Sequence, residues 1–506
     1  MNEKLYITTA IDYVNGRPHM GHAMEKVGAD VLARYLRARG DDVWLVLGSD
    51  EHSQSVEREA RQQGKTPEQF CDEMEVVWRE FWSRYQIDIS EYVRSSSPAN
   101  RATTDEFMRR IHDNGFIYKG VYAGWYCPNG EQFYPAEELL PGGYCPEHPH
   151  VKTEWVEEEN YFFKASAFEE PVRKLLQRPD FLQPEERRRE MLNAIGEGLR
   201  DVSISRAFTR WGFPLPFDAT QVVYVWFDAL LCYVTGAGFA TDDGRFERYW
   251  PCDVHVIGKG ITRFHTLMWP AMLLAAGVAL PRRVYAHGYI TMGGEKMSKS
   301  RGLFFDPAQL VEIFGSDGAR YLLTRGFPWD RDTDFDLDQL VERFNSDLAN
   351  DVGNLAARTL TMLERYRGGE VPAAAPGPAG LPLEEVVSAV DGHMRAFAFD
   401  EALAEVWRLV TWANRYIEDS APWHLAKEPT RRRELDEVLY TCAEVLRVLS
   451  VLLHPFMPSS MDELRRRLGT PPAASWAEAT AWGGLRQGTA TETGMPLFPR
   501  LDPVSA

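Results

Sequence analysis

The sequence predicts an α/β protein with a doubly wound parallel sheet, which an inserted subdomain splits and a C-terminal α-helical bundle follows. Three observations support this fold class. Short apolar runs flank an amphipathic helix near the start of the chain, the pattern turns irregular between about residues 116 and 223, and apolar residues recur at helical spacing beyond residue 338. Alternating strands and helices are typical of a parallel sheet that helices cover.

The first strand, helix and strand follow from their apolar patterns. Leu5–Ala10 is a short β-prone run, and His22–Arg39 carries apolar residues at helical spacing. Val43–Leu47 is a near-continuous apolar run, as expected of a strand that helices cover on both faces. Ligands bind such sheets beyond the carboxyl ends of the strands. We therefore expect the polar segments 13–22 and 49–53 to border one site.

The rest of the sheet follows the insertion, in which proline, glycine, paired cysteine and histidine residues and an acidic run replace the regular pattern. Strand-like runs return at Val254–Ile257 and Val284–Ala286, and the second of them leads into a glycine-rich polar loop at 292–301. We therefore expect strands from both sides of the insertion to join in one sheet.

The C-terminal part predicts a helical bundle. Its clearest apolar series recurs every three or four residues from Leu435 to Leu453, which indicates a helix with one buried face. The segment 369–382 is rich in proline, alanine and glycine and cannot hold a regular helix. We expect this segment to be an exposed connection between two helices.

Composition and charge exclude several classes of protein. A hydrophobic share of 44% and a charged share of 26% are typical of a folded globular chain. The net charge of −18 argues against a non-specific cationic coat for nucleic acid, although a local basic groove is compatible with it. Six cysteines in 506 residues are too few for a disulfide scaffold, which favours a reducing cytoplasm. We expect no secretory signal, because no long apolar run stands near the start of the chain. We also expect no membrane span, because Pro270 interrupts the longest apolar stretch.

Two polar motifs lie at opposite ends of the split sheet. His19-Met20-Gly21-His22 stands where the first strand hands over to the helix, so both imidazoles and the helix N-terminus can face one anion. Lys296-Met297-Ser298-Lys299-Ser300 follows two glycines and presents two ammonium groups that suit a polyphosphate. Taken alone, the first motif fits ordinary helix capping and the second fits a solvated loop. Their combination in this order is much more specific.

With both motifs in this order, the chain resembles a class I aminoacyl-tRNA synthetase, and segments between the motifs are similar to those of the methionyl-tRNA synthetases. The segments that carry the resemblance are Ala10–Gly16, Gly48–His52, Tyr224–Ala229, Gly258–His265 and Trp269–Met272. The resemblance extends from the first strand to at least Trp423. It implies ATP-dependent ligation of L-methionine to its tRNA through methionyl-adenylate, with Mg²⁺ accompanying ATP.

The resemblance also implies a division of the chain. The expected units are a Rossmann-like catalytic half at 1–115, an inserted knuckle subdomain at 116–223, a second catalytic half at 224–290, a lysine-loop and stem-contact region at 291–338, and a helical anticodon-binding domain at 339–506. We expect a cytoplasmic monomer that is not bound to a membrane.

Carried over by position, the resemblance implies two substrate sites. The expected methionine pocket consists of Ile11, Tyr13, Asp50, Trp226, Ala229, Leu230, Tyr233, Ile261 and His265. The expected ATP site consists of His19, Gly21, His22, Glu25, Lys296, Met297, Ser298 and Lys299, of which the two histidines and the two lysines are expected to be catalytic. The residue types agree with these roles, because a thioether packs well on aromatic rings and a carboxylate can hold the substrate ammonium. Without the flanking motifs, Trp226 and Tyr233, seven residues apart, would fit a core stripe better than a pocket.

The resemblance places anticodon recognition at Asn354, Arg358 and Trp423 in the bundle. Aromatic stacking and hydrogen bonds from Arg or Asn are the means by which proteins recognise unpaired RNA bases. On the residue types alone, a buried tryptophan and an Arg–Asn pair on a helix surface are about as compatible with the sequence.

Three positions depart from the family pattern, of which Ser53, in place of the more common glycine, matters least. Cys127, Cys145 and His148 resemble three ligands of a zinc knuckle, but Gly130 stands where the family has a fourth ligand. A structural zinc site wants four protein ligands, so we expect zinc to be weakly bound or absent. Gly260 stands where the family usually has an aspartate, so a carboxylate expected beside the nucleotide is missing.

Three other functions share parts of this pattern. A class I synthetase for another apolar amino acid is one of them, but the large editing insertion of the leucyl, isoleucyl and valyl enzymes has no room between residues 116 and 223. A catalytically silent tRNA-binding homologue would not need the intact histidines and lysines of the two motifs. A nucleotidyltransferase that makes dinucleotide cofactors shares the histidine motif but does not explain the helical C-terminal part.

Overall fold

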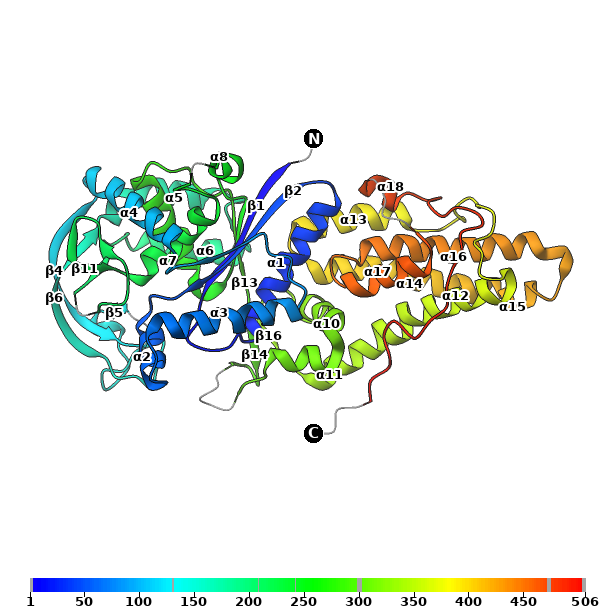
Figure 1. The fold of residues 1–506 in the computed structure, drawn as a ribbon, viewed down its shortest axis with the longest axis horizontal. Helices are drawn as coiled ribbons and strands as arrows, with labels where there is room; N and C mark the ends of the chain where they lie inside the picture. Colours follow the sequence, from blue (N-terminus) through cyan, green and yellow to red (C-terminus); the bar gives the residue numbers. More distant parts are fainter. Residues whose placement is uncertain are drawn as a thin grey trace.

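The computed structural model describes residues 3–129, 132–207, 209–241, 243–297, 303–470 and 475–502. The molecule is elongated, with an α/β part at one end and a bundle of helices at the other (Figure 1). This arrangement confirms the fold class expected from the sequence. Within the described ranges, no helix is both long enough and apolar enough to cross a bilayer.

A six-stranded parallel sheet with the order β3-β2-β1-β12-β13-β7 forms the centre of the α/β part. Its strands are β1 (Lys4–Tyr13), β2 (Asp42–Asp50), β3 (Glu91–Arg94), β7 (Leu182–Gln183), β12 (Val254–Gly258) and β13 (Val284–His287). Strands from both sides of the insertion thus pair in one sheet, as expected. The insertion adds an edge strand of its own, β7, which its sequence did not indicate.

Helices cover both faces of this sheet. Ile7 and Leu45 belong to the core on one face, whereas Tyr6 and Val46 belong to the core on the other face. This alternation explains the near-continuous apolar strands, because successive side chains enter different cores. The helices of the α/β part are α1 (Met20–Ala38), α2 (Gln54–Gln62), α3 (Pro67–Arg84), α4 (Pro98–Asp113), α7 (Val225–Gly236), α8 (Arg245–Tyr249), α9 (Trp269–Ala275) and α10 (Pro307–Arg325).

The insertion forms antiparallel sheets and two helices. One sheet has the order β5-β4-β6-β8 and another the order β10-β11-β9. The elements are β4 (Ile117–Cys127), β5 (Gln132–Tyr134), β6 (Glu154–Phe163), α5 (Glu169–Gln177), α6 (Glu185–Gly196), β8 (Val202–Ser203), β9 (Ser205–Arg206), β10 (Pro214–Leu215) and β11 (Asp218–Val223). A further small sheet after β13 contains β14 (Ile290–Met292), β15 (Glu295–Lys296) and β16 (Thr333–Asp334).

The helical part is joined to the sheet through buried polar contacts. Arg320 of α10 is fully buried and lies 2.7 Å from the Asp30 carboxylate of α1. It also donates to the carbonyls of Pro455 and Phe456 in the bundle, at 2.7 and 3.0 Å. The bundle helices are α11 (Leu337–Arg343), α12 (Asn354–Arg367), α13 (Leu383–Arg395), α14 (Phe399–Ser420), α15 (Pro422–Leu425), α16 (Arg432–Leu452), α17 (Pro458–Arg467) and α18 (Trp476–Thr480).

The proline-rich connection in the bundle is irregular, as expected, but it is only partly exposed. Val371 and Ala375 are buried. Trp482 of the C-terminal segment donates to the Ala375 carbonyl at 2.9 Å, and the Val371 amide donates to the Thr489 carbonyl at 2.9 Å. The expectation of an exposed connection was therefore wrong at these positions, because the C-terminal segment packs over them.

Candidate active site

The histidine motif lies at the N-terminus of α1, beyond the carboxyl end of β1. The rings of His19 and His22 stack with their centroids 3.5 Å apart. The backbone N–H of each histidine donates to Nδ1 of the other, at 3.1 and 3.3 Å. Because both Nδ1 atoms accept, each neutral ring carries its proton on Nε2. A Cβ at Gly21 would lie 3.1 Å from the His19 ring, so this glycine leaves room for the ring pair.

A buried charge cluster lies directly beneath the histidine pair. Lys26 has no exposed side-chain surface and lies 2.6 Å from Asp12 and 2.8 Å from Glu25. The second oxygen of Glu25 lies 3.0 Å from Nε2 of His287, at the end of β13. Burial raises the pKa of Asp12 to about 7 against the attraction of Lys26. Burial would also raise the pKa of Glu25, but Lys26 and His287 outweigh it and lower that pKa to about 2.

Sequence reasoning identified Glu25 but missed Asp12, Lys26 and His287. A signal was present, because Asp12 follows closely after the predicted strand Leu5–Ala10 and two charged residues, Glu25 and Lys26, stand next to apolar residues of the predicted helix. Charges in such places are almost always paired. The cluster ties β1, α1 and β13 together at the edge of the sheet where ligands bind.

Aromatic residues from three elements meet beside the histidine motif. Tyr13 of β1 contacts Trp226 of α7 edge to face, with ring centroids 6.0 Å apart. Phe264 stacks on Trp226, with centroids 3.9 Å apart. Asp50 is buried at the end of β2, directly opposite Tyr13 in the strand register. Phe264 was not expected from the sequence, although it lies inside one of the segments that carry the resemblance.

The floor of this pocket is a buried chain of hydrogen bonds. The Tyr233 hydroxyl lies 2.7 Å from Nε2 of His265, and Nδ1 of His265 lies 3.0 Å from the Ile261 carbonyl. Burial lowers the pKa of His265 to about 4, so the ring is neutral at pH 7. A neutral ring that donates to the carbonyl through Nδ1 accepts from Tyr233 at Nε2. Ala229 and Leu230 are buried one turn earlier on α7, and Ile11 is half-buried on β1.

The segment after β2 is held by residues that sequence reasoning did not assign. His52 lies 2.5 Å from the buried Asp228 carboxylate of α7. Arg94 donates to both oxygens of the buried Glu51 carboxylate, at 2.7 and 3.1 Å. These contacts fix the segment that carries Asp50.

Only the base of the lysine loop is described. Asp334 of β16 accepts hydrogen bonds from the backbone of Gly293 and Gly294 at 3.1 and 3.0 Å. The backbone of Lys296 pairs with Thr291, and Met297 packs, half-buried, on the main core. Ser298 and Lys299 lie outside the described residues, as does the side chain of Lys296.

Two family models cover most of the chain. The model for class I tRNA synthetases (M) matches residues 5–152 and 148–360, and the model for the anticodon-binding domain of tRNA ligases matches residues 382–487. A methionine--tRNA ligase of Caldanaerobacter subterraneus is 41% identical and covers 99% of this chain and 80% of its own length. That of Bacillus subtilis is 38% identical, with shares of 99% and 78%.

The chain belongs to the methionyl-tRNA synthetase family. A solved structure of the Mycobacterium tuberculosis methionyl-tRNA synthetase bound by methionyl-adenylate matches with a TM-score of 0.93 and 36% identity, covering 98% of this chain and all of that chain (100%). The free form of the same enzyme matches with a TM-score of 0.86, at 34% identity and 99% of each chain. The described residues are thus closer in shape to the adenylate-bound form.

The residues expected to recognise the anticodon belong to helices α12 and α15 of the bundle. These helices lie toward the end farthest from the sheet (Figure 1). Asn354 is exposed at the start of α12, and Arg358 follows one turn later on the same face, 2.6 Å from Glu418 of α14. Trp423 is half-buried on α15. A half-buried indole keeps part of its ring available to a partner.

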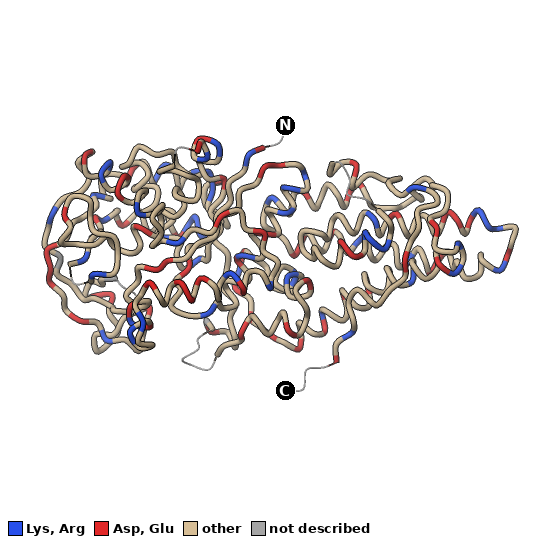
Figure 2. The backbone as a smooth tube through the Cα atoms, viewed as in Figure 1, with Lys and Arg blue, Asp and Glu red and all other residues tan. Residues whose placement is uncertain are grey.

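Charge along the methionyl-tRNA synthetase chain is mixed, as Figure 2 shows: acidic and basic residues alternate in both the α/β part and the bundle. At the far end of the bundle, Arg431 pairs with Glu434 at 2.7 Å and Arg433 pairs with Glu437 at 3.0 Å. The net charge of −18 disfavours non-specific binding of polyanions.

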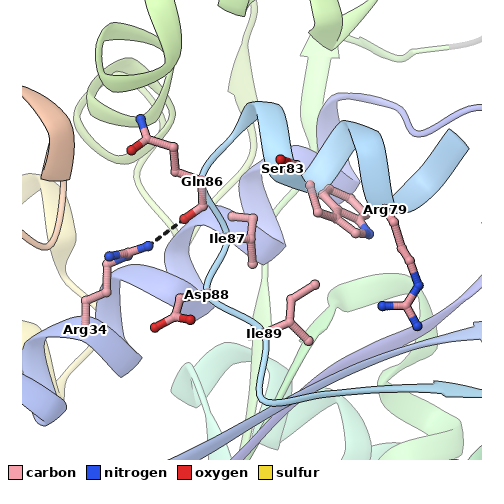
Figure 3. A pocket seen from close by; sticks show the side chains of 8 residues that line it. Arg34, Arg79, Ser83, Gln86, Ile87, Asp88 and Ile89 are labelled. Atoms are coloured by element: carbon pink, nitrogen blue, oxygen red, sulfur yellow. Dashed lines mark hydrogen bonds between the residues drawn. The ribbon is translucent and has the colours of Figure 1, made fainter. Parts of the chain in front are cut away.

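A cavity of about 340 Å³ lies elsewhere (Figure 3). Its lining residues are Arg34, Arg79, Trp82, Ser83, Gln86, Ile87, Asp88 and Ile89. Arg34 lies near the C-terminal end of α1, at the opposite end of that helix from His19, and donates to the Gln86 carbonyl at 2.6 Å. None of the synthetase site residues expected from the sequence lines this cavity.

Proposed function

We propose that this chain ligates L-methionine to its tRNA in two steps, through a methionyl-adenylate that forms from ATP with release of pyrophosphate. The observation that carries the proposal is the convergence, at one edge of the sheet, of the His19–His22 pair and the aromatic pocket around Trp226. The first suits a polyphosphate and the second suits a thioether. Relatives named methionine--tRNA ligase favour this function over a synthetase for another apolar amino acid.

In the first step, the methionine carboxylate attacks the α-phosphate of ATP. No general base is needed, because this carboxylate is already ionised. The enzyme has to align the reactants and stabilise the charge that develops on pyrophosphate. The His19 and His22 rings and the N-terminus of α1 face the phosphates, with Nε2 of His22 3.5 Å from the Asp12 carboxylate, and Lys296 and Lys299 close over the β and γ groups. Mg²⁺, when bound with ATP, neutralises part of the phosphate charge.

The methionine pocket combines one charge with apolar contacts. The Asp50 carboxylate holds the substrate ammonium. The thioether packs against Trp226 and Tyr13, and such sulfur–aromatic contacts are each worth about 0.3–1.5 kcal/mol. The floor formed by Tyr233 and His265 is neutral, so it does not attract amino acids with charged side chains in place of methionine.

In the second step, the terminal adenosine 2′-hydroxyl of the tRNA takes the methionyl group from the adenylate. We further propose that the enzyme acts as a cytoplasmic monomer.

The ligase function is tested by aminoacylation of unfractionated tRNA with each of the apolar amino acids. Methionine should charge a tRNA that carries the methionine anticodon, and isoleucine, leucine and valine should not. Preferred charging with any of those three, or no charging at all, would contradict the proposal.

We predict that Trp423→Ala impairs aminoacylation but not adenylate synthesis, because the residue lies far from the sheet. Stacking on an aromatic ring is worth about 1–3 kcal/mol per base, so aminoacylation at sub-saturating tRNA should fall about tenfold or more. The control is Trp412→Ala, which removes another half-buried tryptophan of the bundle, stacked on Tyr416 at 5.0 Å. Equal aminoacylation by both variants would assign Trp423 to packing.

The knuckle in the insertion offers zinc three ligands. Nδ1 of His148 lies 3.7 Å from each of the buried Cys127 and Cys145 sulfurs. Tetrahedral zinc with ordinary bond lengths separates such atoms by about 3.6 Å, so the spacing fits three of four positions. Gly130 and Glu131 lie outside the described residues, and within the described ones only these three ligands converge.

We therefore predict that the purified protein holds less than about half an equivalent of zinc, because stable structural sites have four protein ligands. Activity should resist chelators once Mg²⁺ is restored. Gly130→Cys, which supplies a third thiolate and thus a fourth ligand, should raise the zinc content to about one equivalent. Elemental analysis after dialysis measures the zinc content of the unmodified protein and of the variant. A full equivalent in the unmodified protein that Cys127→Ser abolishes would contradict this prediction.

A further inference from the structure

Two loops, one after β12 and one after β13, meet at the edge of the crevice around His19, Asp50 and Trp226. Gly258 and His287 end these strands and are paired in the register. His287 contacts Glu25 of α1 at 3.0 Å, so both loops border the same crevice as the histidine pair. Gly260 and Tyr289 each lie two residues further along their loop, on the ligand-binding edge of the sheet.

The hydroxyl of Tyr289 occupies the space that a side chain at residue 260 would need. A Cβ built on Gly260 would lie 2.1 Å from the Tyr289 oxygen but 3.4 Å from the ring carbon that bears it. The overlap therefore involves the hydroxyl alone. Gly260 has no left-handed φ and its backbone is exposed, so glycine is needed there for space rather than for conformation.

Tyr289 is held in place by Asp332. The Tyr289 backbone N–H donates to one oxygen of this carboxylate at 2.9 Å, and Lys259 lies 2.7 Å from the other oxygen. The Lys259 ammonium also lies over the Tyr289 ring, 4.8 Å from its centroid. Burial, together with the carboxylates of Asp332 and Glu147, raises the pKa of Tyr289, so its hydroxyl stays protonated at neutral pH.

We propose that the Tyr289 hydroxyl, admitted by the missing side chain at Gly260, hydrogen-bonds to bound ATP. It takes the place that a carboxylate at residue 260 would have beside the nucleotide. A hydroxyl can donate as well as accept and adds no negative charge next to the phosphates. The inference rests on the proposed function, because it needs ATP in this crevice.

The first test is Tyr289→Phe, which removes only the hydroxyl. Loss of one neutral hydrogen bond should raise the KM for ATP about three- to tenfold in ATP–pyrophosphate exchange. The KM for methionine and the thermal unfolding midpoint should stay unchanged. An unchanged KM for ATP would overturn the proposed contact. Methionine-dependent ATP–pyrophosphate exchange by the unmodified enzyme, measured alongside, tests the proposed function separately.

The second test exchanges the two groups. Gly260→Asp alone should lower kcat/KM for ATP on the order of 100-fold, because the new side chain displaces Tyr289 and misplaces the loop. Adding Tyr289→Phe removes the overlap, so the double variant should recover to within about tenfold of wild type. Gly392→Asp is the control, because residue 392 is exposed with open space around it. Full activity of Gly260→Asp, or no recovery in a folded double variant, would overturn the inference.

Discussion

Replacing Lys299 with alanine is expected to slow methionyl-adenylate formation on the order of 100- to 1,000-fold, because the residue meets charge that grows as pyrophosphate departs. An interaction that strengthens only in the transition state lowers the rate without weakening substrate binding in proportion. Methionine affinity should therefore change little. Single-turnover formation of the adenylate and equilibrium binding of methionine measure the two quantities separately.

Asp334 anchors the Gly293–Gly294 turn at the base of the loop through two backbone hydrogen bonds. Lys174→Ala is the matched control, since this lysine is exposed on α5 and pairs with Glu170, at 3.4 Å, in the same helix. Losses of equal size in the adenylate rate and in methionine affinity would show that Lys299 is not a transition-state clamp.

The largest effect on stability is expected at Lys26. Lys26→Met should lower the free energy of unfolding by about 3–5 kcal/mol, because it leaves two buried carboxylates without their cation. Lys26 has no exposed side-chain surface and joins Asp12 to Glu25. Urea denaturation followed by tryptophan fluorescence measures the change, and ATP–pyrophosphate exchange should fall with it because the cluster supports the histidine pair.

Two further variants separate charge from packing. Lys65→Met removes a surface lysine that pairs with Glu73 at 2.6 Å, and it should change stability by about 0–1 kcal/mol. Lys26→Met combined with Glu25→Gln should be more stable than Lys26→Met alone, because Glu25 is the carboxylate that stays ionised, whereas burial already raises the pKa of Asp12 to about 7. Equal stability of the Lys26 and Lys65 variants would contradict the assigned role.

Much of the fold could be predicted because apolar periodicity reports burial directly. The first helix was expected at 22–39 and spans 20–38, and the strands around Leu5, Val43, Val254 and Val284 all joined the central sheet. The apolar series of α16 is buried along its length. The two polar motifs also lie at the edge where parallel sheets bind ligands.

The rest depends on contacts between distant segments, which local patterns do not encode. The two-residue strand β7 exists only because β13 is there to pair with it. The Val371 region is buried only because a segment more than a hundred residues later packs over it. His287 and Phe264 joined the site in the same way, through the folding of separate strands and helices into one crevice.

ATP–pyrophosphate exchange with each amino acid in turn tests the central claim most directly, because it reports adenylate formation without tRNA. Exchange should be fast with methionine, near background without an amino acid, and on the order of 100-fold slower with leucine, isoleucine or valine. A rate that does not depend on methionine, or a faster rate with another amino acid, would contradict the assignment of the crevice around His19, Asp50 and Trp226 as a site for methionine and ATP.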